Sequence, residues 1–188
     1  MPARVSQRSS GVHLLESRSH LRSLVEAADL GPNSLVFDLG AGPGTLTTHL
    51  ARTGARVIAI ERSSTFLSQL RRRFADHSNV RVVAGDLREV PFPHRPFQIV
   101  ASIPFGLSTP LLRRLLGTRT TRLGRADLVV EWGFAKRMLE PTPRGRELER
   151  WRSRFEFTLV RRIPATAFRP TPAVDCAHLA ITRRHRRK

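Results

Sequence analysis

Three glycines at alternate positions form the first candidate ligand-binding segment of the chain. The sequence reads Asp38-Leu-Gly40-Ala-Gly42-Pro-Gly44-Thr45, directly after a short apolar run. Glycine has no Cβ, so this spacing lets the backbone adopt positive φ angles and approach a ligand closely. A dinucleotide site typically has G-x-G-x-x-G, whereas here the third glycine comes one residue early. The pattern therefore favours a nucleoside cofactor without a pyrophosphate, with Asp38 and the three glycines as candidate cofactor-binding residues.

Two acidic residues lie at the ends of the next two predicted strands. Glu61 ends the second strand, where its carboxylate can accept both hydroxyls of a ribose. Asp86 follows the third strand, where it can accept from the amine of an adenine, and Leu87 beside it is a further candidate cofactor-binding residue. Each acid alone could be a surface residue at a strand end. Together with the glycines they predict a nucleoside-cofactor site, because open α/β sheets bind ligands at the carboxyl edge of their strands.

The tetrapeptide Ser102-Ile103-Pro104-Phe105 follows the fourth predicted strand and is similar to the [Asp/Asn/Ser]-x-Pro-[Tyr/Phe] element of amino-methyltransferases. An exocyclic base amine is a poor nucleophile, because its lone pair is delocalised into the ring. The Ser102 oxygen, also a candidate cofactor contact, and the Ile103 carbonyl would accept the two N–H groups, so that the lone pair can point at a methyl donor. Pro104 would stiffen the turn and Phe105 would stack on the extruded base. The alternative is an ordinary turn with Phe105 in the core.

Apolar and β-branched runs alternate with segments of helical spacing along most of the chain. Strands are predicted at 35–39, 57–60, 80–84, 97–101, 127–132, 155–160 and 177–182, and helices at 44–53, 64–75, 108–116 and 134–139. Residues 140–154 are predicted as a Pro-punctuated basic loop that becomes helical. This order predicts an α/β fold with a doubly wound, mostly parallel sheet and a terminal antiparallel hairpin. We expect a single domain over residues 1–182 and a basic tail over 183–188.

The charge of the chain indicates a polyanionic partner. The 188 residues contain 33 basic and 15 acidic side chains, giving a formal net charge of +18. Charge alone leaves RNA, DNA and anionic membrane open. Only Lys136 and Lys188 are lysines, so nearly all of the positive charge is carried by guanidinium groups. These bind phosphates in a fork and stack on unpaired bases better than ammonium groups do.

Other features of the composition limit the cofactor and the cell compartment. The single cysteine, Cys176, excludes an internal disulfide and a Cys-cluster zinc site, and the histidines lack HExxH-type spacing, so no metal is expected. No apolar run approaches the roughly 18–20 residues that cross a bilayer, so we expect no membrane partner. The Arg- and Ser-rich start over residues 1–10 could mimic a mitochondrial transit peptide. We expect a cytoplasmic protein and a monomer.

In this order, the glycine segment, Glu61, Asp86 and the turn at 102–105 resemble the ribosomal RNA adenine N6-methyltransferases. That superfamily includes the erythromycin-resistance (Erm) enzymes and the small-subunit adenine dimethyltransferases. Residues 105–116 (FGLSTPLLRRLL) resemble the helix that follows this turn in Erm enzymes. The resemblance covers roughly residues 11–182 and implies a Rossmann-like class I fold that uses S-adenosylmethionine.

The resemblance also assigns individual residues. Residues 167–177 are similar to the F-x-P-x-P-x-V-D-S-A segment of Erm enzymes, which implies that Phe168 is a second stacking surface opposite Phe105. Residues 11–15 (GVHLL) stand where the family has Gly-Gln-Asn-Phe-Leu, which assigns cofactor contacts to His13 and Leu15. Ser102 stands where the family usually has Asn. Most members continue with a helical C-terminal domain, and we interpret this chain as a short form without it.

The resemblance implies transfer of a methyl group from S-adenosylmethionine to N6 of an adenine in 23S ribosomal RNA or its precursor. The added methyl would confer resistance of the macrolide-lincosamide-streptogramin type. Two alternatives stay open, namely methylation of small-subunit ribosomal RNA or DNA, and a catalytically weak nucleic-acid-binding protein of the same fold. From the residues alone, only methylation of a base amine is predicted.

Overall fold

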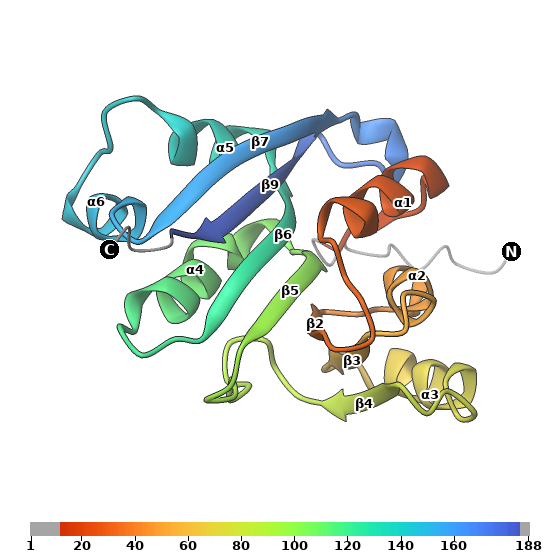
Figure 1. Ribbon diagram of the computed structural model, residues 1–188. Coiled ribbons are helices and arrows are strands. Elements are labelled where there is room, and N and C mark those ends of the chain that lie inside the picture. The colour runs from red at the N-terminus through yellow and green to blue at the C-terminus, as the bar shows by residue number, and fades with distance from the viewer. Residues whose placement is uncertain (1–11, 185–188) are drawn as a thin grey trace, which may run out of the picture.

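A seven-stranded sheet forms the centre of the molecule in the computed structural model, which describes residues 12–184 (Figure 1). The strand order is β4-β3-β2-β5-β6-β9-β7. All neighbouring strands pair in parallel except at β9, which is antiparallel to both β6 and β7. The strand bounds are β2 Leu35–Leu39, β3 Arg56–Glu61, β4 Val80–Ala84, β5 Phe97–Ser102, β6 Leu123–Glu131, β7 Phe155–Ile163 and β9 Cys176–Arg183. The predicted α/β fold with a terminal antiparallel pair is confirmed.

Helices cover both faces of this sheet, each through an apolar stripe. The helices α1 Arg18–Ala27 and α2 Thr45–Ala51 pack on one face against Val36, Val57, Val100 and Val129, and α3 Ser64–Arg73 packs beside them on Ala59. On the other face lie α4 Ser108–Gly117, α5 Trp132–Leu139 and α6 Arg146–Arg152. Two apolar cores on opposite faces hold the strands rigid, so the loops at the strand ends have fixed anchors.

No helix is predicted before residue 44, yet α1 forms there. Leu21, Leu24 and Val25 are its only buried residues, and its N-cap Ser17 makes no side-chain capping hydrogen bond. These three residues have the i, i+3, i+4 spacing of an amphipathic helix, so the sequence does carry the signal and the missing prediction is an error. Packing against α2 and the sheet stabilises the helix.

A second small sheet, also not predicted, pairs β1 Leu14–Leu15 with β8 Phe168–Arg169 in antiparallel fashion. Each strand has only two residues, too few to give an alternating pattern. The pairing joins the start of the described chain to the loop between β7 and β9. It thereby places two sequence-distant segments beside the glycine bend, where the Leu14 Cδ2 atom would lie 3.2 Å from a Cβ at Gly42.

The C-terminal strand extends slightly further than predicted. β9 runs to Arg183, whose guanidinium donates to the Leu123 carbonyl at 2.8 Å and also to the Thr121 carbonyl. The rest of the predicted basic tail, residues 185–188, and the Arg- and Ser-rich start, residues 1–10, lie outside the described residues. Between residues 12 and 184, no helix has both the length and the apolar character that a membrane crossing requires.

Candidate active site

The glycine bend follows β2 at the carboxyl edge of the sheet. Gly40, Gly42 and Gly44 have φ angles of 74°, 54° and 87°, so all three require the left-handed backbone region that L side chains rarely adopt. The bend is anchored on β3, because the Gly40 and Ala41 N–H groups both donate to the Ile60 carbonyl, at 2.9 and 3.0 Å. A Cβ at Gly40 would have Leu87 Cδ2 at 3.9 Å as its nearest neighbour, so this part of the bend borders open space.

Asp38 lies at the end of β2 and is 1% exposed. Its Oδ2 accepts a hydrogen bond from the Thr47 hydroxyl at 2.6 Å. Burial raises the pKa of Asp38 to about 7, the Thr47 hydrogen bond opposes this rise, and the nearby Glu61 carboxylate adds to it. The Asp38 carboxyl therefore titrates near neutral pH at the foot of the glycine bend.

Glu61 ends β3 and joins the bend to the start of α3. Its Oε2 accepts the Gly42 N–H at 2.8 Å, and its Oε1 accepts the N–H groups of Arg62 and Ser63, both at 2.8 Å. A carboxylate has about four lone-pair sites, so roughly one is left for a ribose hydroxyl. Glu61 can therefore accept both hydroxyls of a ribose, as expected, only if one of these three hydrogen bonds from N–H groups is broken.

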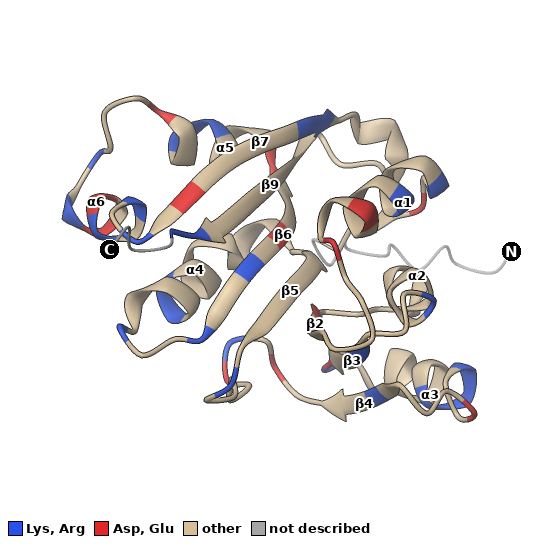
Figure 2. Cartoon of the chain, viewed as in Figure 1, with Lys and Arg blue, Asp and Glu red and all other residues tan. Residues whose placement is uncertain are grey.

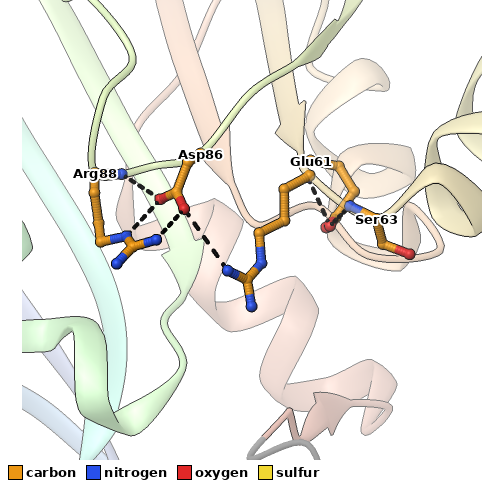
Figure 3. A network of polar contacts seen from close by, with 5 residues as sticks. Glu61, Ser63, Asp86 and Arg88 are labelled. Atoms are coloured by element: carbon orange, nitrogen blue, oxygen red, sulfur yellow. Dashed lines mark hydrogen bonds and ion pairs between the residues drawn. The ribbon is translucent and has the colours of Figure 1, made fainter.

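Asp86 lies opposite Glu61 across the same edge of the sheet, and two arginines surround it (Figure 3). Its carboxylate accepts from the Arg88 side chain at 3.0 and 2.6 Å and from the Arg88 N–H at 2.8 Å, and Arg62 lies 3.7 Å away. These bonds, with the Arg88 side chain contributing most, lower the pKa of Asp86 to about 2. Asp86 is therefore ionised at neutral pH and already accepts three N–H groups, so roughly one lone-pair site is left for an adenine amine while Arg88 stays bound.

The turn at 102–105 lies next to the glycine bend, and the two line a single pocket. Ser102 is the last residue of β5, and the Ile103 N–H donates to the Val129 carbonyl on β6 at 3.0 Å. The pocket contains the whole turn together with residues of the bend, the β1–β8 sheet and α1. Its lining residues are Val12, His13, Leu14, Leu15, Leu21, Asp38, Gly40, Ala41, Pro43, Thr45, Leu46, Ser102, Ile103, Pro104, Phe105 and Phe168. The feature on which an amine-methylating site depends most, the closeness of turn and bend, is present.

Two acceptors in this turn are available to a ligand. Among the described residues, no hydrogen bond is made by the Ser102 hydroxyl or to the Ile103 carbonyl, whereas the Pro104 carbonyl accepts the Leu107 N–H at 2.8 Å. Both free oxygens belong to residues that line the pocket. They are the two acceptors predicted for the N–H groups of a base amine.

The aromatic residues of the pocket differ in how open they are. Phe105 is half-buried, and one face of its ring stacks on His13 with centroids 5.4 Å apart and an interplanar angle of 28°. His13 Nδ1 bonds the Pro170 carbonyl at 2.7 Å, which fixes the imidazole on that face. Phe168 is 1% exposed and belongs to the core under α1. A base can therefore stack on Phe105 through its other face or by displacing His13, and the stacking role of Phe168 stays a prediction.

Several residues have contacts in the site that differ from, or were missing from, the sequence prediction. Thr47 is one turn into α2 and resembles any helical threonine until the fold places it on Asp38. Arg88 is two residues after Asp86, a spacing that could have suggested the pair. His13 is predicted here as a cofactor contact, and the structure places it on Phe105. Leu15 is 4% exposed and lines the pocket from β1.

The residues of this edge fit S-adenosylmethionine. The chain is strongly basic, yet three acids, Asp38, Glu61 and Asp86, gather around the glycine bend, where they complement a cationic sulfonium and amine and the hydroxyls of a ribose. Gly40 leaves room for close approach of a ligand. Across residues 12–184, no group of three or more His, Cys, Asp or Glu side chains is arranged to hold a metal ion.

The strand order, the glycine bend and the pocket at the carboxyl edge define a Rossmann-like class I S-adenosylmethionine-dependent methyltransferase fold. The crystal structure of the 23S rRNA methyltransferase ErmE superposes with a TM-score of 0.83 at 28% sequence identity, covering 91% of this chain and 70% of that one. Residues 5–188 match the family model for ribosomal RNA adenine dimethylase. The chain belongs to this family.

Two relatives with similar sequences carry names that are consistent with this family. An rRNA adenine N-6-methyltransferase of Bacillus licheniformis is 33% identical over 175 residues, covering 93% of this chain and 61% of the relative. The mycinamicin-resistance protein MyrB of Micromonospora griseorubida is 35% identical over 186 residues, covering 97% of this chain and 58% of the relative. The chain thus spans about three fifths of the length of these relatives.

Proposed function

We propose that this chain transfers a methyl group from S-adenosylmethionine to N6 of an adenine in 23S ribosomal RNA, and that the modification confers macrolide-type resistance. The observation that carries the proposal is the shared pocket of the glycine bend and the turn at 102–105. Family membership and the similarity to a mycinamicin-resistance protein and to ErmE support the choice of RNA and of the large subunit.

The cofactor would be held by the acids and glycines of the carboxyl edge. Asp38 and Glu61 flank the bend, and Leu87 packs beside Gly40. Asp86 would bind the adenine amine, and Arg88 competes with the amine for its lone pairs. Bound there, S-adenosylmethionine supplies an electrophilic methyl group on its sulfonium sulfur.

The turn prepares the target nitrogen. The Ser102 hydroxyl and the Ile103 carbonyl accept the two N–H groups of the base amine, which localises the nitrogen lone pair and orients it toward the bend. Serine carries one oxygen on a short side chain, so it holds one N–H group from close to the backbone. No base has to remove a proton before transfer, because the amine proton becomes acidic only once the nitrogen carries the new methyl group.

Phe105 would receive the extruded adenine. Enzymes that modify a base amine take the base out of the stack, and an aromatic ring replaces part of the lost stacking energy. The ring of Phe105 lies in the pocket and is only half-buried. Binding of the polyanion itself is favoured by the net charge of +18.

Labelled methyl transfer to separated ribosomal RNAs tests this function. The chain is incubated with methyl-labelled S-adenosylmethionine and either 23S or 16S RNA, and the modified position is mapped by primer extension. A susceptible bacterium that expresses the chain is then grown on a macrolide, with Phe105→Ala as the control.

We expect label in 23S RNA and growth on the drug for the wild type but not for the variant. Label in 16S RNA or DNA instead would contradict the choice of substrate. Saturable RNA binding with no label in any nucleic acid would favour the catalytically weak binding protein.

A further inference from the structure

A strongly basic hollow lies beside the methyl-transfer pocket and is not used by the proposed chemistry. Its lining residues come from α1, from α2 and the residue directly after it, and from the end of α3, namely Arg18, Arg22, Thr45, Thr48, His49, Arg52 and Arg73. Its volume is about 390 Å³. In Figure 2, α1, α2 and α3 each carry blue segments on the side of the molecule away from α4–α6.

The positive charge of this hollow is not compensated locally. None of the seven lining residues is acidic, and none of the four arginines forms an ion pair with a residue in the described range 12–184. Burial lowers the pKa of His49, and the neighbouring Arg52, Arg22 and Arg18 lower it further. Guanidinium groups that repel one another and have no counter-charge favour an anion that can accept several N–H donors at once.

The hollow adjoins the methyl-transfer pocket. Thr45, the first residue of α2, lines both. Arg73 donates to the Pro43 carbonyl of the bend at 2.8 Å, and the Thr48 hydroxyl donates to the Gly44 carbonyl at 2.8 Å. Polar groups of the hollow therefore contact the backbone of the same bend that borders the pocket.

We propose that this hollow binds backbone phosphates of the RNA strand that flank the extruded adenine. The inference rests on the proposed function, because it takes the target base to enter the adjoining pocket. A base that leaves its stack brings its own flanking phosphates to the pocket mouth, and holding them maintains the extruded geometry. Arg22 on α1 and Arg52 directly after α2 are exposed side chains on two different segments, so together they can clamp one strand from both sides.

The test compares two double variants that remove the same charge. Arg22→Gln with Arg52→Gln removes two arginines of the hollow, and Arg71→Gln with Arg72→Gln removes two exposed arginines of α3 that do not line it. Binding of a 23S-derived hairpin RNA is measured by fluorescence anisotropy over a range of salt concentrations. Calorimetry measures S-adenosylmethionine affinity for each variant, and thermal unfolding verifies that each one folds.

We expect the hollow variant to bind RNA on the order of tenfold more weakly and to flatten the salt slope by roughly 0.7–0.9 for each phosphate that the protein no longer neutralises. The α3 variant should change the slope clearly less, and S-adenosylmethionine affinity should stay within about twofold of the wild type for both, because neither pair touches the acids that would hold the cofactor. Arg22→Lys with Arg52→Lys keeps the charge, so it should keep most of the slope but weaken the affinity through the missing fork.

Equal effects of the two glutamine variants on RNA binding would overturn the inference. Binding to anionic lipid vesicles is measured for the same variants. The inference would also be overturned if the hollow variant lost vesicle binding while its RNA binding stayed unchanged. If the wild type labels no RNA but the two variants still differ in salt slope, the phosphate site stands and the proposed methyl transfer fails.

Discussion

Gly44 is the glycine whose replacement has the most specific structural consequence. Its φ of 87° lies in the left-handed region, and an added Cβ would lie 2.8 Å from Leu70 Cδ2 and 2.9 Å from Phe74 Cε2. Leu70 is 0% and Phe74 4% exposed, so neither can turn toward solvent. Gly54 provides a matched control, because its φ is 79° but its Cβ would meet only Pro32, with Cγ nearest at 3.5 Å.

The magnitudes follow from these two geometries. A left-handed L residue costs about 1–2 kcal/mol, and the smaller entropy of the unfolded chain returns about 0.4–1 kcal/mol. Both effects apply equally to Gly44→Ala and Gly54→Ala. Overpacking a buried cluster costs about 1–3 kcal/mol more and applies only at Gly44. We therefore expect Gly44→Ala to be less stable than Gly54→Ala by about 1–3 kcal/mol.

Urea unfolding followed by circular dichroism measures this difference directly. The two variants should share one m-value, with the midpoint of Gly44→Ala clearly lower. Equal losses of stability in the two variants would refute the reasoning, because they would mean that Leu70 and Phe74 move aside without cost. Weakened S-adenosylmethionine binding only in Gly44→Ala would link the crowding to the shape of the bend.

Three further changes test individual side chains of the site. The folded pKa of Asp38, about 7, exceeds its unfolded value of 3.8, so its contribution to stability is complete below pH 3.8 and is lost as the pH rises through 7. The free energy of unfolding of the wild type should therefore decline by on the order of 4 kcal/mol between about pH 4 and 7, and Asp38→Asn should abolish this decline. The same pH dependence of unfolding in the variant and the wild type would contradict the burial argument. Phe105→Ala should lower methyl transfer strongly, because base stacking is worth about 1–3 kcal/mol, and calorimetry should show a nearly unchanged cofactor affinity. An unchanged rate of methyl transfer would mean that the Phe105 ring does not contact the base. Arg88→Ala should free Asp86 and tighten S-adenosylmethionine binding by roughly two- to fivefold at low salt, and this gain should shrink in high salt. An unchanged affinity would mean that the cofactor does not contact Asp86.

The inner strands of the sheet could be predicted because most of their residues are buried, as in β2 and β9. A strand such as Leu35–Leu39, in which every residue is buried, gives a short apolar run whatever its neighbours are. The α1 helix could have been predicted from the i, i+3, i+4 spacing of Leu21, Leu24 and Val25. The β1–β8 pair could not, since it depends on contacts between distant segments. The pairing of Leu15 with Phe168 is one example.

The site could be predicted as a location but not as a set of contacts. Residues that follow parallel strands meet at one edge, so the sequence alone brings Gly40 and Ser102 together. Spacing does not encode the direction of side chains. The spacing did not reveal that Arg88 is hydrogen-bonded to Asp86 or that His13 stacks on one face of Phe105. It also did not reveal that the Glu61 carboxylate already accepts three N–H groups.

The central claim is that the pocket between the glycine bend and residues 102–105 delivers a methyl group to the exocyclic amine of adenine. Digestion of the labelled RNA to nucleosides, followed by chromatography with mass detection, measures this most directly. We expect all of the label to elute as N6-methylated adenosine, and we expect Phe105→Ala to reduce it strongly. Label on a ribose hydroxyl, on a ring carbon or on another base would contradict the claim.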